Sequence, residues 1–101
     1  MDEVELRINE LDVDTYLALR AGVHWKVLKP EQAQLALKNS LYVVSAYRDG
    51  RCVGMGRLVG DGAVICYVQD LIVLPEVQGR GIGSLILTRL KNRVEELRQE
   101  G

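Results

Sequence analysis

Apolar and polar positions alternate at the start of the chain, in residues 4–10 (VELRINE). This period of two predicts a strand with one face in water. Apolar residues then recur at helical spacing behind Asp12 and Asp14, which can cap a helix that runs to about Arg20. Pro30 opens a second helical stretch over residues 30–40, since proline is tolerated at the first position of a helix.

Three strand-like runs follow, separated by two Asp-Gly turns. Residues 41–48 and 51–60 flank Asp49-Gly50, a dipeptide typical of two-residue hairpin turns. Asp61-Gly62 turns the chain again before a third run over 63–74, and residues 84–97 return to helical spacing. The order is strand, two helices, three antiparallel strands and a helix. It predicts an α+β fold, a mostly antiparallel four-stranded sheet with helices on its faces.

Length and composition narrow the class of protein. A chain of 101 residues suits one domain over 1–101, and an apolar content of 48% argues against disorder. With 13 basic and 14 acidic side chains, the net charge of -1 gives no electrostatic case for nucleic acid or an acidic membrane surface as a partner. No apolar run reaches the ~18 residues that cross a bilayer. The acidic start lacks a signal-peptide pattern, so we expect a cytoplasmic location.

Few residues offer metal or nucleophile chemistry. Cys52 and Cys66 are the only cysteines, and each lies in a strand-like run where a small buried thiol is expected. His24 is the only histidine, so a zinc site or a histidine-based triad has no visible partners. We therefore expect no metal site.

The strongest chemical signal lies in residues 71–87, LIVLPEVQGRGIGSLIL. An apolar strand meets a proline, then a loop with three alternating glycines, and then a helix. The unpaired N–H groups of a first helical turn and the helix dipole attract an anion. Glycine lets a phosphate approach because no Cβ intervenes, while Arg80 adds charge and Ser84 a hydroxyl. The expected ligand is a phosphate or pyrophosphate; the alternative is a tight turn without a ligand.

Two nucleotide-binding motifs do not fit this loop. A Walker loop requires Gly-Lys followed by Ser or Thr, which does not occur in the chain. A dinucleotide fingerprint requires G-x-G-x-x-G in a parallel βαβ unit. Gly79, Gly81 and Gly83 have a different spacing, and the predicted meander is antiparallel.

Residues 78–83 (QGRGIG) match the pattern Q/R-x-x-G-x-G/A, and the strand LIVLP stands directly ahead of them. Here, and in the order of its elements from about Val4 onward, the chain resembles the GCN5-related N-acetyltransferases, the GNAT family. The resemblance implies that acetyl-coenzyme A lays its pyrophosphate on the loop and its pantetheine arm along the last strand, which usually bulges there. The implied cofactor-binding residues are Leu71, Ile72, Val73, Gln78, Gly79, Arg80, Gly81, Ile82, Gly83 and Ser84.

The resemblance also implies a reaction, the transfer of an acetyl group to an amine. The thioester carbonyl gains negative charge as the amine attacks, and the backbone N–H of Val73 is a candidate oxyanion donor. Asp70, beside the bulged strand, is the candidate base, acting directly or through a water. The alternative for Asp70 is a surface carboxylate or a turn contact. Trp25 and His24 lie where the family binds its acceptor, and the alternative for Trp25 is packing between helices.

The sequence departs from the family at its carboxy-terminal side. The family's fold continues with a strand-helix-strand part that supplies the second wall of the pantetheine cleft, and this part has no counterpart here. Its helix commonly carries the tyrosine that protonates the leaving thiolate, and no residue of this chain takes that role. The sequence is equally compatible with a fragment, a designed truncation and a naturally short relative.

Two functions therefore remain open. The first is an acetyl-coenzyme A-dependent N-acetyltransferase, or its cofactor-binding amino-terminal part, acting on a small amine. The second is a non-catalytic module that binds coenzyme A or associates with itself. We expect low activity from the chain alone. We also expect a homodimer, joined through the exposed edge of strand 64–74 or by exchange of the helix over 84–101.

Overall fold

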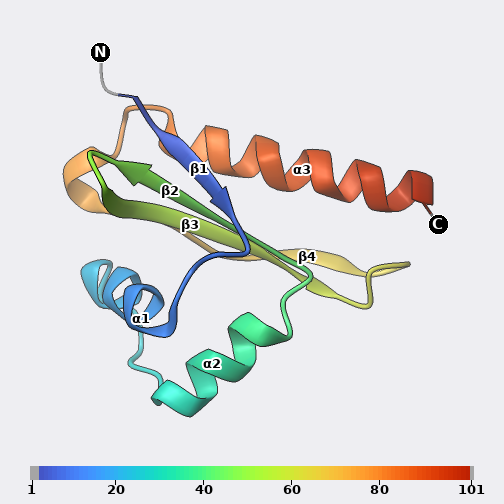
Figure 1. The fold of residues 1–101 in the computed structure, drawn as a ribbon, viewed down its shortest axis with the longest axis horizontal. Helices are drawn as coiled ribbons and strands as arrows, with labels where there is room; N and C mark the ends of the chain where they lie inside the picture. Colours follow the sequence, from blue (N-terminus) through green and yellow to red (C-terminus); the bar gives the residue numbers. More distant parts are fainter. Residues whose placement is uncertain (1–2, 101) are drawn as a thin grey trace.

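The computed structural model describes residues 3–100, and residues 1, 2 and 101 of the predicted domain lie outside the described part. Four antiparallel strands form one sheet in the order β1-β2-β3-β4, with helices on both faces (Figure 1). The predicted α+β fold is confirmed. The elements are β1 Glu5–Ile8, α1 Val13–Gly22, α2 Pro30–Lys38, β2 Tyr42–Arg48, β3 Arg51–Gly60, β4 Cys66–Val73, the short 3-10 helix η1 Pro75–Val77, and α3 Ile82–Glu100.

Local sequence signals explain where several elements begin. The carboxylate of Asp12 accepts the Thr15 N–H at 2.8 Å and caps α1. Hydrogen bonds from Thr15, first from its side chain and then from its backbone N–H, hold the pKa of Asp12 below its usual value. Pro30 occupies the start of α2, as predicted. Asp49 and Gly50 both adopt positive φ, 53° and 77°, which is the conformation that a tight hairpin turn requires.

β1 and β4 are shorter than the sequence pattern predicts, and the sequence does not predict the short helix η1. β1 covers Glu5–Ile8 instead of 4–10, and β4 begins at Cys66 instead of at residue 63. Asp61 explains the late start of β4, because its Oδ1 accepts the N–H groups of residues 63, 64 and 65 at 2.8–2.9 Å. Those residues curl around the carboxylate before the strand can pair.

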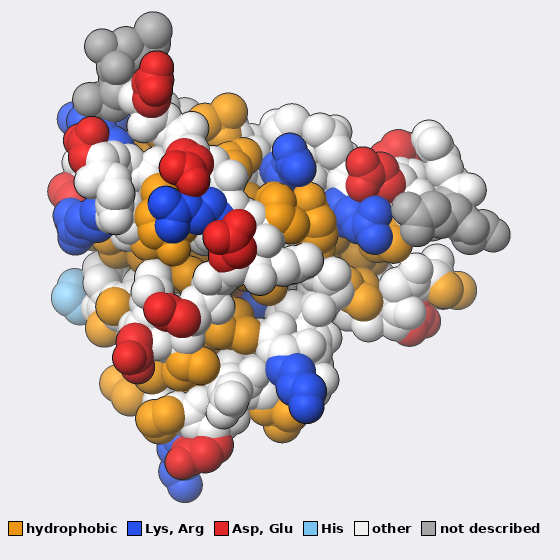
Figure 2. Space-filling view, viewed as in Figure 1, with side chains coloured by type: hydrophobic (Ala, Val, Ile, Leu, Met, Phe, Trp, Pro, Cys, Tyr) orange, Lys and Arg blue, Asp and Glu red, His pale blue; other side chains and the backbone are white. Residues whose placement is uncertain are grey.

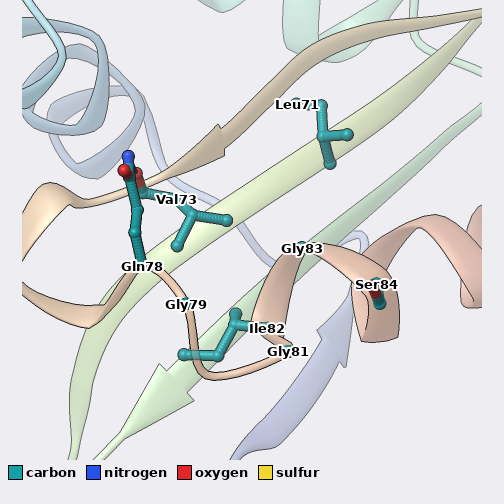
Figure 3. Close-up of a pocket in the computed structure, with 8 residues that line it drawn as sticks. All are labelled: Leu71, Val73, Gln78, Gly79, Gly81, Ile82, Gly83 and Ser84. Carbon is teal, nitrogen blue, oxygen red and sulfur yellow. Dashed lines mark hydrogen bonds between the residues drawn. The ribbon is translucent and has the colours of Figure 1, made fainter.

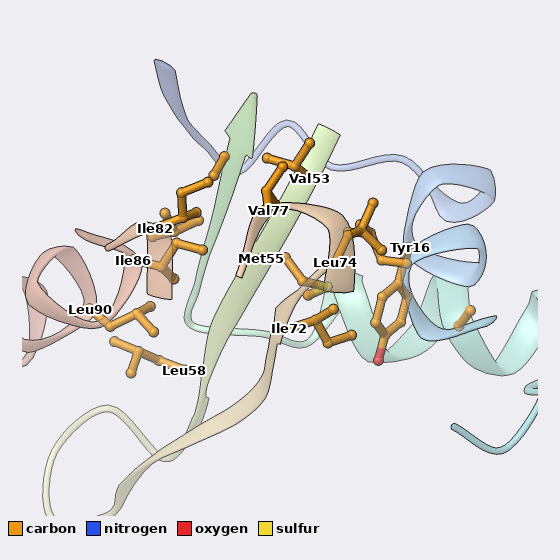
Figure 4. Close-up of a cluster of buried hydrophobic side chains, with 14 residues drawn as sticks. Tyr16, Val53, Met55, Leu58, Ile72, Leu74, Val77, Ile82, Ile86 and Leu90 are labelled. Carbon is orange, nitrogen blue, oxygen red and sulfur yellow. The ribbon is translucent and has the colours of Figure 1, made fainter. Parts of the chain in front are cut away.

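The sheet divides the hydrophobic core into two layers (Figure 4). The layer under α3 contains residues spaced four apart on that helix, and the layer under α1 contains side chains from α1, β3 and β4. In the first layer lie Leu58, Ile82, Ile86 and Leu90; in the second lie Tyr16, Leu19, Met55, Ile72 and Leu74. Leu85, which also lies in α3, is 47% exposed.

Two glycines in β3 allow α3 to lie close against the sheet. A Cβ at Gly54 would stand 3.1 Å from Ile86 Cδ1, and one at Gly56 would stand 2.9 Å from Ile86 Cγ2 and 2.8 Å from Leu90 Cδ1. Contacts this short require the α3 side chains to shift, so larger residues would move the helix away from the sheet. The strand CVGMGRLVG thus fixes how near the start of α3 comes to β4.

Candidate active site

β4 carries a bulge in its middle. Met55 pairs with Ile72 and Arg57 with Gln69, so Gly56 alone stands opposite the two residues Asp70 and Leu71. Asp70 has φ 53°, in the left-handed region. An extra residue of this kind interrupts the hydrogen-bond ladder and bends the strand. The bulge that the family resemblance implies is therefore present.

Beyond the bulge, backbone groups of β4 face the open side of the sheet. Leu74 donates its N–H to the Val53 carbonyl at 2.9 Å. Because successive strand residues alternate in direction, the N–H and C=O of Val73 turn away from β3. Within residues 3–100, β4 pairs only with β3. The Val73 N–H thus lies at an open edge, and the Gln78 side-chain amide donates to the Val73 carbonyl at 2.8 Å.

A pocket of about 460 Å³ lies between this edge and the start of α3 (Figure 3). Most of the predicted cofactor-binding residues meet around it: Leu71, Val73, Gln78, Gly79, Gly81, Ile82, Gly83 and Ser84. The side chain of Ile72 instead points to the opposite face of the sheet, where it is 1% exposed. Arg80 does not line the pocket.

The glycine loop presents the start of α3 to the pocket. Gly79 and Gly81 both have φ 82°, a conformation that only glycine adopts without strain. The first hydrogen bond of α3 runs from the Leu85 N–H to the Gly81 carbonyl at 3.1 Å. The N–H groups of residues 82–84 precede it and have no acceptor within the helix. Together with the helix dipole, they form a site for an anion.

Asp70 takes part in a buried ion cluster on the other face of the sheet. Its side chain is 9% exposed, and Arg57 Nε lies 2.7 Å from Oδ2, while Arg20 Nη1 lies 3.1 Å from Oδ1. The Tyr16 hydroxyl donates a further hydrogen bond to Oδ2. Asp70 is therefore not a surface carboxylate or a simple turn contact, which were the two alternatives to a role as base. Oδ1 retains a lone pair for another donor, so the role as base stays a prediction.

The three partners of Asp70 were not predicted as site residues. Tyr16 and Arg20 follow the apolar stripe of α1, and Arg57 is a charged residue inside an otherwise apolar strand. Arginines at positions such as 20 and 57 indicate a buried carboxylate partner, but their spacing in the sequence does not identify which carboxylate it is. Burial, followed by the hydrogen bond to Asp70, raises the pKa of the Tyr16 phenol above its usual 10.0.

The predicted acceptor residues lie just beyond α1. Trp25 is 40% exposed, and its ring lies 5.4 Å from the Arg20 guanidinium, which also donates to the Lys26 carbonyl. His24 is exposed and has φ 61°. Figure 2 shows hydrophobic side chains gathered over α1, α2 and their connection, and the large exposed ones there are Trp25, Val27 and Leu35. Arg20 therefore connects this surface to Asp70.

Other reactive groups are sparse in the described part of the chain. Cys52 and Cys66 are free and half-buried, and burial raises the pKa of the Cys52 thiol. Residues 3–100 contain no cluster of three or more histidine, cysteine or acidic side chains that could hold a metal ion. No helix in that range is long and apolar enough to cross a bilayer.

Comparison with known proteins identifies the family. Residues 7–101 match the family model described as "Acetyltransferase (GNAT) family". The chain belongs to this family.

Similar proteins include several acetyltransferases. A probable acetyltransferase of meticillin-resistant Staphylococcus aureus has a TM-score of 0.88 and 30% identity, over 95% of this chain and 72% of that one. Serotonin N-acetyltransferase 2 of rice, a chloroplastic protein, is 33% identical over 90% of this chain and 46% of its own length. An aminoglycoside N-acetyltransferase, AAC(6')-Iy, solved with coenzyme A, shares the fold with a TM-score of 0.74 and 13% identity, over 95% of this chain and 72% of that one.

The chain spans about half the length of the curated relatives that it matches. The substrates and partners of the whole protein are therefore proposed below. The cytoplasmic location expected from the sequence also stays a prediction.

The buried hydroxyl of Tyr16 generates a first prediction. Replacing Tyr16 by Phe removes a hydrogen bond to a buried carboxylate, so the free energy of unfolding should fall by about 1.5–3 kcal/mol. The matched control is Tyr42→Phe, because the Tyr42 hydroxyl accepts only an exposed hydrogen bond from Arg89. This variant should change the free energy of unfolding by less than about 0.5 kcal/mol. Urea denaturation of the three proteins measures both values.

The pH dependence of the same pair has a definite sign. Because the pKa of Tyr16 is raised in the folded state, the advantage of the parent over Tyr16→Phe should be complete below pH 10.0 and decline at more alkaline pH. Urea denaturation at a series of pH values measures this difference in the free energy of unfolding. At neutral pH, an equal fall in the free energy of unfolding for Tyr16→Phe and Tyr42→Phe would contradict the first prediction.

Proposed function

We propose that the chain is the cofactor-binding amino-terminal part of an acetyl-coenzyme A-dependent N-acetyltransferase that acts on a small amine. The observation that carries this proposal is the glycine loop at the start of α3, which opens into a pocket against the bulged edge of β4. Membership of the GNAT family and the coenzyme A complex of AAC(6')-Iy support the choice of cofactor.

Each part of coenzyme A has a chemically suitable surface. The pyrophosphate suits the N–H groups of residues 82–84, the loop 78–81 and the Ser84 hydroxyl, because these combine donors with the positive end of a helix dipole. The pantetheine amides suit the open edge of β4, where the backbone groups of Val73 turn away from β3. The Val73 N–H is the proposed oxyanion donor, since it faces the same edge.

The acceptor is proposed to approach from the face that carries Asp70. Asp70 would accept the proton of the attacking amine through a water on Oδ1. Trp25 and His24 would contact the body of the amine, and the exposed aromatic ring favours an acceptor with a flat apolar group. The similarity to the rice enzyme, whose name gives an aromatic amine as its substrate, supports this acceptor class.

The second candidate function is a non-catalytic module that associates with itself. It is favoured by exposed apolar side chains on and near β4, the strand whose outer edge is unpaired within residues 3–100. Those side chains are Val64 (90% exposed), Tyr67 (60%), Val68 (39%), Leu71 (38%) and, on α3, Leu85 (47%). An unpaired edge with apolar surroundings pairs readily with a second copy.

Binding of coenzyme A to the loop is the first test. The ligand should slow hydrogen exchange of the amides of residues 79–84, because their N–H groups would bind phosphate oxygens. Gly81→Val should weaken binding at least tenfold, since φ 82° is strained for valine. Gly50→Val is the control, because φ 77° imposes a similar backbone strain on valine at a hairpin turn that does not line the pocket. Unchanged exchange at millimolar coenzyme A would refute the anion site.

Acetyl transfer is the second test, measured with acetyl-coenzyme A and a panel of small amines. The 101-residue chain alone should turn over well below the usual enzyme range of about 1–10³ s⁻¹, because β4 lacks a facing cleft wall in the described residues. In a longer form that includes such a wall, Asp70→Asn should slow transfer more than tenfold, and by a larger factor than it weakens coenzyme A binding. An unchanged transfer rate at every pH would exclude Asp70 as the base.

Self-association is the third test. We expect a homodimer, joined through the β4 edge or by exchange of α3, and sedimentation at several concentrations measures it. Tyr67→Lys places a charge on the exposed edge strand and should dissociate an edge-joined dimer. Gln34→Lys, on exposed α2, adds the same charge elsewhere and should leave the dimer intact. A monomer at all concentrations would remove this candidate.

A further inference from the structure

Asp70 has an unusual backbone conformation for its position. Among the described residues, four that are not glycine have positive φ: Asn9, His24, Asp49 and Asp70. The first three lie in turns or just outside helices and strands, whereas Asp70 lies inside β4. The left-handed region is unfavourable for L-residues, and such a residue persists only where its surroundings determine it.

Those surroundings consist of hydrogen-bond donors from two neighbouring elements. Tyr16 and Arg20 reach Asp70 from α1, and Arg57 reaches it from β3. Both arginines are themselves fixed by backbone carbonyls. Arg57 donates to the Ala36 carbonyl at 3.4 Å, and also to Ser40 Oγ at 3.2 Å, while Arg20 donates to the Lys26 carbonyl at 3.0 Å. The carboxylate is therefore held from several directions.

The bulge at Asp70 decides which side chains face the pocket. Side chains alternate between the faces of a strand, so a shift of one residue moves each of them to the other face. With the bulge, Leu71 and Val73 line the pocket and Ile72 is buried under α1. Without the bulge, the side chains on one side of it, either before or after, would point to the opposite face of the sheet. Different backbone N–H and C=O groups would then lie at the open edge.

We propose that Arg20 and Arg57 are positioning residues, which hold Asp70 in the left-handed conformation and thereby fix the register of residues 71–73 against the pocket. The proposal gives Asp70 a conformational role besides the role of base. Its effect on the cofactor rests on the proposed function, but its effect on β4 does not.

The test compares Asp70→Gly with Asp70→Ala. Both variants lose the carboxylate and leave the same arginines without it, but only glycine adopts positive φ freely. If the conformation matters, Asp70→Gly should bind coenzyme A about tenfold more tightly than Asp70→Ala in calorimetry. If the bulge has no effect on the pocket, the two folded variants should bind coenzyme A equally, although Asp70→Ala should still be the less stable, because alanine is strained at positive φ.

A second measurement needs no ligand. In the ligand-free chain, hydrogen exchange at Leu74, whose N–H donates to Val53, should remain slow in Asp70→Gly and become faster in Asp70→Ala. Equal exchange and equal affinity in the two variants would overturn the proposal. If no protein binds coenzyme A but the exchange rates differ, the proposed function fails and the positioning role stands.

A third variant covers the case in which Asp70→Ala does not fold. Arg57→Met removes one partner of Asp70 and keeps the carboxylate, so exchange at Leu74 should become faster. Adding Asp70→Gly to Arg57→Met should slow that exchange again, because glycine no longer requires a partner to hold it. Failure of the double variant to restore slow exchange would overturn the proposal.

Discussion

The buried carboxylate of Asp70 joins three elements of the molecule at one point. It lies in β4, accepts hydrogen bonds from α1 and β3, and through Arg57 reaches the end of α2. A buried anion is tolerated only when its charge is compensated and its oxygens are hydrogen-bonded. The helices on this face are therefore tied to the same point of β4 at which the strand bulges.

The opposite face depends on a steric constraint instead of a charge. Gly54 and Gly56 leave room for Ile86 and Leu90, so α3 lies directly on β3. This contact places the first turn of α3 beside the carboxy-terminal half of β4, where the pocket forms. The ion cluster sets the direction of the β4 backbone, and the glycines set the distance of the helix from it. The pocket requires both.

Much of this arrangement could be predicted from the sequence because its signals are local. The Asp-Gly turns, the Pro30 start and the glycine loop each depend on a few neighbouring residues, and the loop with its family motif located most of the pocket. The cluster around Asp70 could not be predicted, since Arg20 and Asp70 are 50 residues apart and meet only through the fold. The role of Gly54 and Gly56 could not be predicted either, because it depends on how closely α3 packs against β3 in the fold. The late start of β4 could not be predicted, because an apolar run does not show that the Asp61 carboxylate accepts the N–H groups of the three residues 63–65.

The hydrogen bond between Gln78 and Val73 has a consequence for the energetics of ligand binding. The Val73 carbonyl already accepts an amide N–H before any ligand arrives. A ligand amide can share this oxygen with Gln78, because a carbonyl has two lone pairs, or it can displace Gln78. If it displaces Gln78, one N–H···O bond replaces another with little net gain. The charged end of the ligand at the helix terminus would then contribute more of the affinity, and that contribution should weaken as ionic strength rises.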